Sequence, residues 1–242
     1  MAATYFFGVI DTVEAVQNGE NKGGVCVKTK ERIQTLKMSA EQGDKDSQYE
    51  LGRCYDLGEG VKKNYKKAFG WFEIAALKGS VEAQYRLAVF YKYGKGTEKD
   101  LKKSVLWYEK AAEQGNMRAQ SALGILYACG IGIKKNYKKA VHWYEEAAKQ
   151  GHSRSQYLLA NCYRDGKGVK SNYCKALFWY EKAAAQGEID ALSEPLLQHL
   201  RNDRKKEALC LFMECANMSI DDVVNTINTA TWEASQCQIS QE

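Results

Sequence analysis

Residues 79–114 read GSVEAQYRLAVFYKYGKGTEKDLKKSVLWYEKAAEQ, and this stretch is the second of four copies of a 36-residue unit. The copies cover residues 43–78, 79–114, 115–150 and 151–186. Two residue types mark the period: glycines at Gly43, Gly79, Gly115, Gly151 and Gly187, and tryptophans at Trp71, Trp107, Trp143 and Trp179. A fixed period of about 20–50 residues is typical of stacked supersecondary units that share one core, so the sequence predicts an elongated array.

Each unit is predicted to form two helices joined by a loop. In the second copy, apolar residues recur at helical spacing in both halves: Ala83, Leu87, Phe90 and Tyr91, then Leu101, Val105, Tyr108 and Ala112. Between the halves lie Gly94 and Gly96, which suit the left-handed backbone that ends a helix, and Asp100, which can cap the next helix. Neither helix buries its apolar face within one unit. We therefore expect neighbouring units to stack, with the tryptophans packed between them.

The four copies share, in register, a pattern that resembles a known family. This pattern is G-[DN]-x-x-A-Q-Y-x-L-G-x-x-Y-x-x-G-x-G-V-x-x-N-Y-x-K-A-x-x-W-Y-E-K-A-A, and it is similar to the Sel-1-like repeat, a relative of the tetratricopeptide repeat. The resemblance covers well over half of the chain. It implies an all-α, right-handed superhelix (a solenoid) of helix–turn–helix units and a role in assembling protein complexes. We accordingly expect a non-enzymatic scaffold or adaptor whose partner is a protein or peptide.

The ends of the chain depart from the pattern and are expected to cap the array. Residues 1–42 are interpreted as a degenerate N-terminal repeat, in which Gly23-Gly24-Val25 corresponds to the loop and residues 31–42 to the second helix. Residues 187–218 are interpreted as a degenerate C-terminal repeat, and residues 219–242 as a capping helix and tail. Divergent terminal units are what an array needs to seal its open ends.

Charge and composition narrow the class of protein further. The formal net charge is +5, but residues 43–186 carry 26 Lys and Arg against 15 Asp and Glu, whereas residues 187–242 carry 4 against 10. No apolar run approaches the ~18 residues of a membrane span, and the start, MAATYFFGVIDTVEA, lacks the basic region and apolar length of a secretory signal. We expect a cytoplasmic protein or, alternatively, one exported without a classical signal peptide into a host cell.

Residues with catalytic or metal-binding chemistry form no recognised constellation. None of the eight cysteines recurs as a pair with the period, and no CxxC occurs, so they are interpreted as reduced, small apolar filler. The histidines His142, His152 and His199 belong to no HExxH or Cys/His metal spacing. The Gly-x-Gly loops follow helices and none completes G-x-G-x-x-G, which indicates structural turns. We expect no catalytic residues, no cofactor and no metal.

The partner-binding surface is predicted on one face of the first helices. The fourth, eighth, eleventh and fifteenth positions of each copy share that face and are not fixed by the pattern. By analogy with tetratricopeptide arrays they line a concave groove, which would suit an extended or helical peptide with a carboxylate and hydrophobic anchors. Ordinary surface variability is the alternative explanation. The predicted groove residues are Arg53, Leu57, Arg86, Val89, Tyr93, Arg118, Ala122, Ile125, Arg154, Leu158 and Asn161.

Two other functions stay open beside protein binding. Lysines of the loops and second helices could form a basic ridge for an acidic protein or a phosphoinositide, although a solvated edge is more typical and nucleic acid is not expected. These are Lys62, Lys63, Lys66, Lys67, Lys99, Lys102, Lys103, Lys134, Lys135, Lys138, Lys139, Lys170 and Lys175. An enzyme would need a site in the degenerate ends, where His199, Asp203 and Cys210 are off-pattern polar residues. A narrower version of the adaptor hypothesis is a bacterial effector that acts on a host protein.

Overall fold

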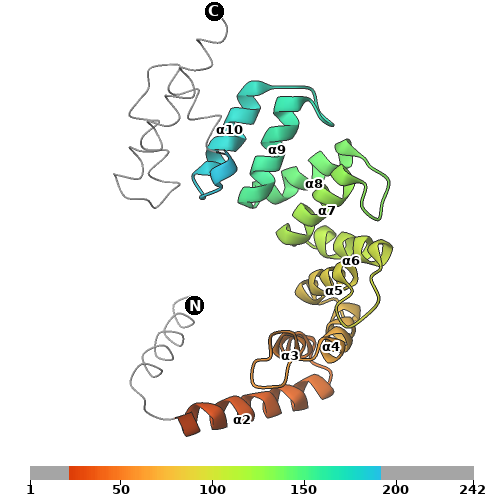
Figure 1. The fold of residues 1–242 in the computed structure, drawn as a ribbon, viewed down its shortest axis with the longest axis vertical. Helices are drawn as coiled ribbons and strands as arrows, with labels where there is room; N and C mark the ends of the chain where they lie inside the picture. The colour runs from red at the N-terminus through yellow and green to blue at the C-terminus, as the bar shows by residue number, and fades with distance from the viewer. Residues whose placement is uncertain (1–21, 192–242) are drawn as a thin grey trace, which may run out of the picture. The chain divides into compact units, whose positions relative to one another are not determined.

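The computed structural model describes residues 22–191, and within that range the fold consists of α-helices and one short 3-10 helix (Figure 1). The chain divides into two compact units, residues 1–107 and residues 108–242. The division falls inside α6 (Leu101–Glu113). Both units are built from the same repeated pair of helices.

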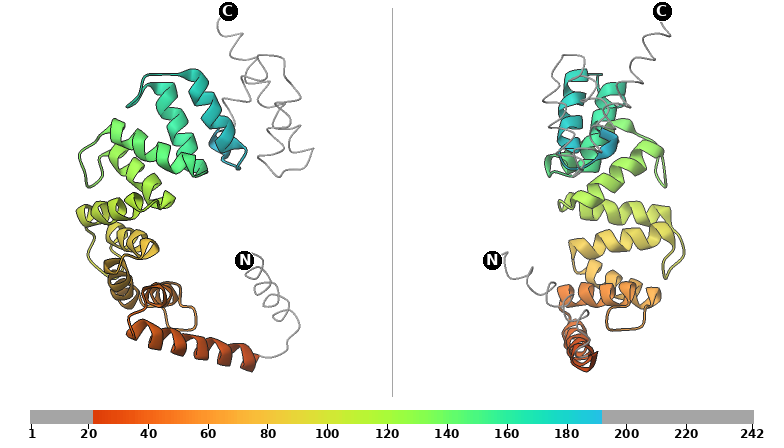
Figure 2. Two further views of the ribbon diagram at one scale, coloured as in Figure 1. Left: turned by 180° about the vertical axis from the view of Figure 1, so that it is seen from behind. Right: turned by 60° about the vertical axis from the view of Figure 1, so that its left-hand side comes forward.

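The first unit contains an N-terminal helix, three complete helices of the repeats and the start of the next one. Its elements are α2 (Lys22–Glu41), α3 (Lys45–Leu57), α4 (Tyr65–Leu77), α5 (Val81–Tyr93) and the beginning of α6. Helix α3 packs against both α2 and α4, and α4 packs against α5 (Figures 1 and 2). Helices α3 and α5 are the first helices of their repeats, and α4 is a second helix.

The second unit continues the same alternation. It contains the end of α6, α7 (Met117–Cys129), α8 (Tyr137–Lys149), α9 (Ser153–Asp165), α10 (Tyr173–Ala184) and the 3-10 helix η1 (Ile189–Ala191). Each helix from α7 to α10 packs against the next, and α10 also contacts η1. The predicted fold class, an all-α solenoid of helix–turn–helix repeats, is confirmed by these elements.

The helices begin and end at the residues that the pattern indicates. An Asn or Asp side chain caps each second helix by accepting the backbone N–H three residues later, at 2.9–3.0 Å; these caps are Asn64, Asp100, Asn136 and Asn172. The first helices end at glycines with left-handed backbone, Gly58, Gly94, Gly130 and Gly166. The second glycine of the loop has a different role. At Gly96 a Cβ atom would lie 2.3 Å from the carbonyl oxygen of Tyr65, so only glycine allows the loop to approach α4 this closely.

A buried glutamine joins each first helix to the helix before it. Its Nε2 donates to the carbonyl of an alanine eight residues earlier, at 2.9–3.2 Å, in the pairs Gln48–Ala40, Gln84–Ala76, Gln120–Ala112 and Gln156–Ala148. These glutamines are at most 5% exposed. A buried amide is costly without a partner, so this bond fixes how one repeat follows the next.

Helix α2 precedes the first repeat, in the position that the second helix of the previous copy holds before each later repeat. It packs against α3 and supplies the Ala40 carbonyl that Gln48 requires. The loop predicted at Gly23-Gly24-Val25 is wrong, because these residues lie inside α2. A glycine in a helix interior costs only about 1 kcal/mol, and such a local preference is readily overridden by the rest of the fold. The interpretation of residues 1–42 as a capping repeat stays a prediction, since residues 1–21 lie outside the described range.

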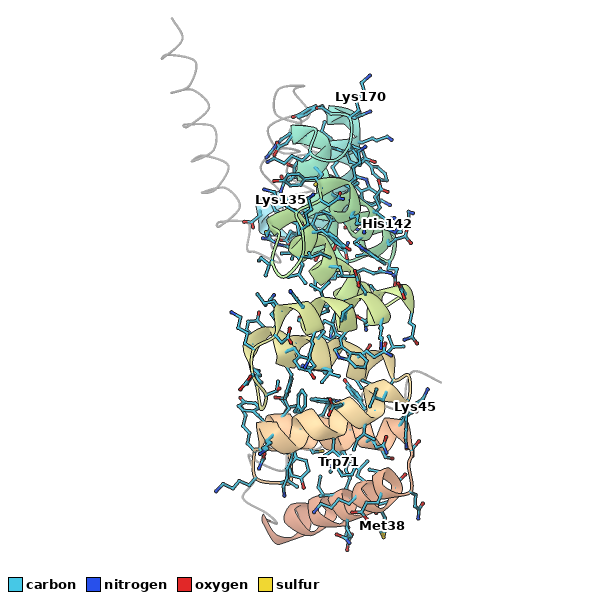
Figure 3. All side chains as sticks on the ribbon, turned by 90° about the vertical axis from the view of Figure 1, so that its right-hand side faces the viewer. Met38, Lys45, Trp71, Lys135, His142 and Lys170 are labelled. Carbon is cyan, nitrogen blue, oxygen red and sulfur yellow. The ribbon has the colours of Figure 1, made fainter. Side chains whose placement is uncertain are left out.

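Each second helix contributes small residues and one aromatic ring to the core. Alanine pairs in the second helices are at most 2% exposed: Ala75–Ala76, Ala111–Ala112, Ala147–Ala148 and Ala183–Ala184. The aromatic residue that follows each tryptophan is at most 3% exposed: Phe72, Tyr108, Tyr144 and Tyr180. The tryptophans themselves are half-buried, and Figure 3 labels Trp71 on α4. Successive helical residues point about 100° apart, so only one of the two neighbours can face the centre.

One position of the first helix holds a small residue in every copy: Gly52, Ala88, Gly124 and Ala160. At the two glycines, the buried aromatic ring of the second helix comes very close to the first helix. A Cβ atom at Gly124 would lie 2.3 Å from Cε1 of Tyr144. By contrast, Gly70 in the middle of α4 has no atom within 4 Å of the place where its Cβ would lie.

We therefore expect two Gly→Ala substitutions to have opposite effects. Gly124→Ala should lower the free energy of unfolding by about 1–3 kcal/mol, because the Tyr144 ring must move within a packed core. Gly70→Ala should raise it by about 0.5–1 kcal/mol, because it removes helix-interior glycine without any clash. Urea unfolding followed by circular dichroism measures both. Equal effects of the two substitutions would contradict the close approach at Gly124.

The cap of α9 is a histidine. His152 Nδ1 accepts the backbone N–H of Ser155 at 3.2 Å, so the ring must be neutral at that nitrogen. The charged side chains acting on it are Arg118 of α7 and Glu188, in the turn before η1. Burial, and then Arg118, lower the pKa of His152 below its ordinary value of 6.5, while Glu188 opposes this shift. Asp44, Ser80 and Asn116 occupy the same slot in the other repeats.

This cap predicts a pH-dependent stability. The unfolded chain takes up the proton first as the pH falls, so the contribution of His152 is complete above about pH 6.5 and is lost as the pH falls through the folded pKa. His152→Asn keeps a capping oxygen, as at Asn116, and should flatten this part of the profile. Urea midpoints between pH 5 and 8 test it. A His152→Asn profile parallel to that of the wild type would rule out the histidine as the source.

Candidate binding surface

All eleven residues of the predicted groove lie on first helices. In the first unit these are Arg53 and Leu57 on α3 with Arg86, Val89 and Tyr93 on α5; in the second they are Arg118, Ala122 and Ile125 on α7 with Arg154, Leu158 and Asn161 on α9. Leu57 and Tyr93 are 51% and 62% exposed, and Arg118 and Arg154 are also exposed. The other seven are half-buried. Their use by a partner stays a prediction.

The arginine on α3 has an acidic neighbour on its own helix. Arg53 Nη1 lies 3.1 Å from Glu50 Oε1, and each of the two side chains is about one-third exposed. Such a pair one turn apart contributes little to stability because solvent screens it. Its main effect is to hold the Arg53 guanidinium close to α3, where its charge is partly balanced.

The arginine on α9 is more strongly engaged by the chain itself. Arg154 Nη1 donates to Glu188 Oε1 at 2.8 Å and to Asp190 Oδ2 at 3.0 Å, and the guanidinium lies 5.0 Å from the Tyr157 ring centroid. Sequence reasoning assigned Arg154 to an incoming carboxylate and missed both internal ones. The repeat register could have shown one of them, because Asp190 stands 36 residues after Arg154 and so holds the same position in the next repeat.

The two exposed arginines of the second unit should therefore differ in their effect on stability. Arg154→Glu should lower the free energy of unfolding by about 1 kcal/mol, because it breaks two ion pairs and brings three carboxylates together. Arg118→Glu should cost less than about 0.5 kcal/mol, the usual range for an exposed site. Urea unfolding at low salt and at 1 M NaCl measures both, and salt should shrink the Arg154 effect. An effect of Arg154→Glu that salt does not change would argue against this ion-pair origin.

Asn161, also on α9, is held by the core. Its Oδ1 accepts a hydrogen bond from the hydroxyl of Tyr180, the buried ring of α10. The side chain is therefore used to satisfy a buried tyrosine. In the second unit, the predicted groove residues therefore fall into two groups. Arg154 and Asn161 are bonded to other side chains of the protein, which leaves Arg118, Ala122, Ile125 and Leu158 as candidate contacts for a partner.

One lysine of the predicted basic ridge in every repeat lies over a tyrosine ring. Lys67, Lys103, Lys139 and Lys175 are 5.2–5.4 Å from the ring centroids of Tyr55, Tyr91, Tyr127 and Tyr163, respectively. Two of these tyrosines also donate to a glutamate of the preceding second helix at 3.0 Å, in the pairs Tyr127–Glu109 and Tyr163–Glu145. Burial and the Glu109 bond raise the pKa of Tyr127 to about 12. These four lysines thus have a structural role that the sequence reading did not foresee.

The described cysteines and histidines are placed as follows. Cys54 and Cys162 are buried, and burial raises the pKa of the Cys162 thiol to about 11, which fits their use as apolar filler. Cys129, Cys174 and His142 are exposed. Within residues 22–191 no group of three or more His, Cys, Asp or Glu side chains is placed to hold a metal ion. In the same part of the chain, no helix combines the length and apolarity of a membrane span. His199, Asp203 and Cys210 lie outside the described residues.

Comparisons with known proteins agree with this geometry. The model of the Sel1 repeat matches residues 45–80, 81–116, 118–152 and 153–188. A solved structure of c5321, described as a protective antigen present in uropathogenic Escherichia coli strains displaying an SLR fold, is 33% identical over 76% of this chain, with a TM-score of 0.71. A Sel1 repeat protein from Oxalobacter formigenes is 32% identical over 74% of this chain and 75% of its own, with a TM-score of 0.65.

The match to the E. coli antigen covers 40% of that longer chain. A comparison with curated protein sequences gave no match. The stacked helix pairs and their repeated caps define a helical-repeat solenoid. The chain belongs to the Sel1 repeat family, whose members generally mediate protein–protein interaction and are typically non-enzymatic scaffolds.

Proposed function

We propose that the protein is a non-enzymatic scaffold or adaptor that holds a protein partner on the outward positions of its first helices. The observation that supports this proposal is that conserved and variable positions of each repeat have different roles. The positions that recur in all copies pack in the core or join the helices: Leu51, Leu87, Leu123 and Leu159 are 0% exposed, and the glutamines bond to the previous helix. The positions that vary are exposed or half-buried on the same helices, and most of them have no role in joining the repeats. A surface without a packing role can change its chemistry without loss of the fold.

The chemistry of the outward face differs between the two units. In the first unit it offers two exposed apolar side chains, Leu57 and Tyr93, at the C-terminal ends of α3 and α5. In the second unit it offers the exposed Arg118 beside the half-buried Ala122 and Ile125 on α7. Tyrosine and arginine are enriched among the side chains that contribute most to binding, and apolar anchors hold helical peptides in grooves. A carboxylate-bearing peptide with hydrophobic residues is the partner chemistry that these groups suit.

The first unit provides a matched pair of leucines for the test. Leu57 is the last residue of the first helix α3, and Leu77 is the last residue of the second helix α4; they are 51% and 71% exposed. Leu57→Ser should weaken recovery of the partner about tenfold or more, because a leucine that is buried on binding contributes about 1.5–3 kcal/mol. Leu77→Ser should leave recovery unchanged. Quantitative affinity purification from the native cell measures both.

Both leucine variants should unfold within about 0.5 kcal/mol of the wild type, since the changed side chains are exposed. The proposal is contradicted when Leu77→Ser loses the partner and Leu57→Ser retains it. The cytoplasmic location, the alternative of export into a host cell and an effector role on a host protein stay predictions. The same purification from host cells would test the effector role.

A further inference from the structure

Two lysines from consecutive repeats meet over one tyrosine in the first unit. Lys63 Nζ lies 4.9 Å and Lys95 Nζ lies 5.3 Å from the centroid of the Tyr65 ring. Lys63 belongs to the loop before α4, and Lys95 belongs to the Gly94–Gly96 turn one repeat later. The backbone of this turn packs directly on the start of α4: a Cβ atom at Gly96 would lie 2.3 Å from the Tyr65 carbonyl oxygen. The fold itself therefore brings the two ammonium groups to one ring.

Both lysines are accessible to a ligand. Lys63 is exposed and Lys95 is half-buried. A side-chain hydrogen bond and charge interaction with Tyr65 raise the pKa of Lys63, and Asp56 makes the smallest contribution in the same direction. Asp56 is buried, at 8% exposed, so it does not cover the two ammonium groups. Two positive charges beside one ring attract an anion.

The second unit has lysines at the equivalent positions, and one of them is paired with a carboxylate of the chain. Lys135 Nζ lies 4.8 Å from the Tyr137 ring centroid, and Lys167 stands in the turn one repeat later, where Lys95 stands in the first unit. There Asp165 Oδ2 accepts from Lys167 Nζ at 2.8 Å. The first unit has Tyr93 at the position of Asp165. Asp165, which also accepts from Arg164 Nε at 2.9 Å, thus balances the charge of Lys167, whereas the first unit has no carboxylate at this position.

We propose that Lys63 and Lys95, above the ring of Tyr65, form a binding site for a phosphate monoester group. Its charge of about −1.5 to −2 at pH 7 matches two ammonium groups, whereas a single carboxylate balances only one. Lysine binds phosphate as a point charge, and the planar fork that arginine offers to a carboxylate is not what these two residues provide. The site lies on the loops between first and second helices. It does not depend on the proposed partner surface.

Titration of the full chain with inorganic phosphate and with O-phosphoserine tests the site, at pH 7.5 and low ionic strength because exposed contacts are screened. Lys95→Ala and Lys63→Ala should each weaken binding about tenfold, the effect of losing one charged contact. Tyr93→Asp introduces the carboxylate found at Asp165 and should weaken binding by a similar factor. Asp165→Asn should add a second site at Lys135 and Lys167.

Lys45→Ala is the matched control, because Lys45 begins α3, at the opposite end of that helix from the loop that carries Lys63 (Figure 3). It should bind phosphate like the wild type. Equal weakening by Lys45→Ala and Lys95→Ala would mean diffuse surface charge and would overturn the site, as would wild-type affinity in Tyr93→Asp or the lack of saturable binding. Thermal melting of each variant checks that the fold is kept.

Two further probes distinguish the source of the phosphate. A short peptide with one phosphoserine represents a modified protein, and vesicles with phosphatidylinositol 4-phosphate represent a lipid headgroup. Binding of either probe that Lys95→Ala weakens about tenfold supports the site and identifies the source. Vesicle or peptide binding that Lys95→Ala leaves unchanged contradicts it.

Discussion

The hydrogen bond from a buried glutamine to the end of the previous helix is the constraint on which the repeat stack depends. In each copy the Gln amide reaches a carbonyl of an alanine that is itself almost inaccessible to solvent. Apolar packing alone would tolerate small rotations of one helix pair against the next. An amide in a dry interface does not, because a shift would leave both donor and acceptor unpaired at a cost of about 1–3 kcal/mol. The alanines allow the close approach, and the glutamine sets its register.

In the first repeat, the buried glutamine lacks one of the hydrogen bonds that it has in later repeats. In the third and fourth repeats, the last glutamine of the copy donates to the carbonyl oxygen of the buried one, as Gln150 does to Gln120 at 2.8 Å. The first copy has Lys78 at that position, and its ammonium donates to the Gly43 carbonyl instead. The Oε1 atom of Gln48 then has no hydrogen-bond partner among the described residues. The repeat next to α2 is thus less completely satisfied than the later ones.

Local signals predicted the helices well, because caps and left-handed glycines act within a few residues of the chain. Asn64 and Gly58 fulfil the roles that their residue types indicate. Signals that depend on the helix surface were less informative. The period identified the tryptophans but did not show that the next residue, such as Tyr144, faces the centre. Gly23 and Gly24 looked like a loop and lie in a helix.

The candidate surface was predictable in position but not in its internal contacts. Periodicity placed the groove residues on first helices, as found. The ion pairs of Arg154 and the lysine–tyrosine pairs join residues of different helices. Each lysine–tyrosine pair lies within one copy and depends on how the two helices of that copy pack. The ion pairs of Arg154 reach the next copy, and a single copy of the repeat does not contain that information. Reading equivalent positions across successive copies is the step that recovers part of it.

Identical junctions also bear on how such a chain can change in evolution. Because the donor glutamine and the acceptor carbonyl recur every 36 residues, unequal recombination between two copies would regenerate a complete junction at the crossover. Gain or loss of a whole copy therefore leaves no new unpaired group at the seam. The length of the array can therefore change in steps of one whole copy.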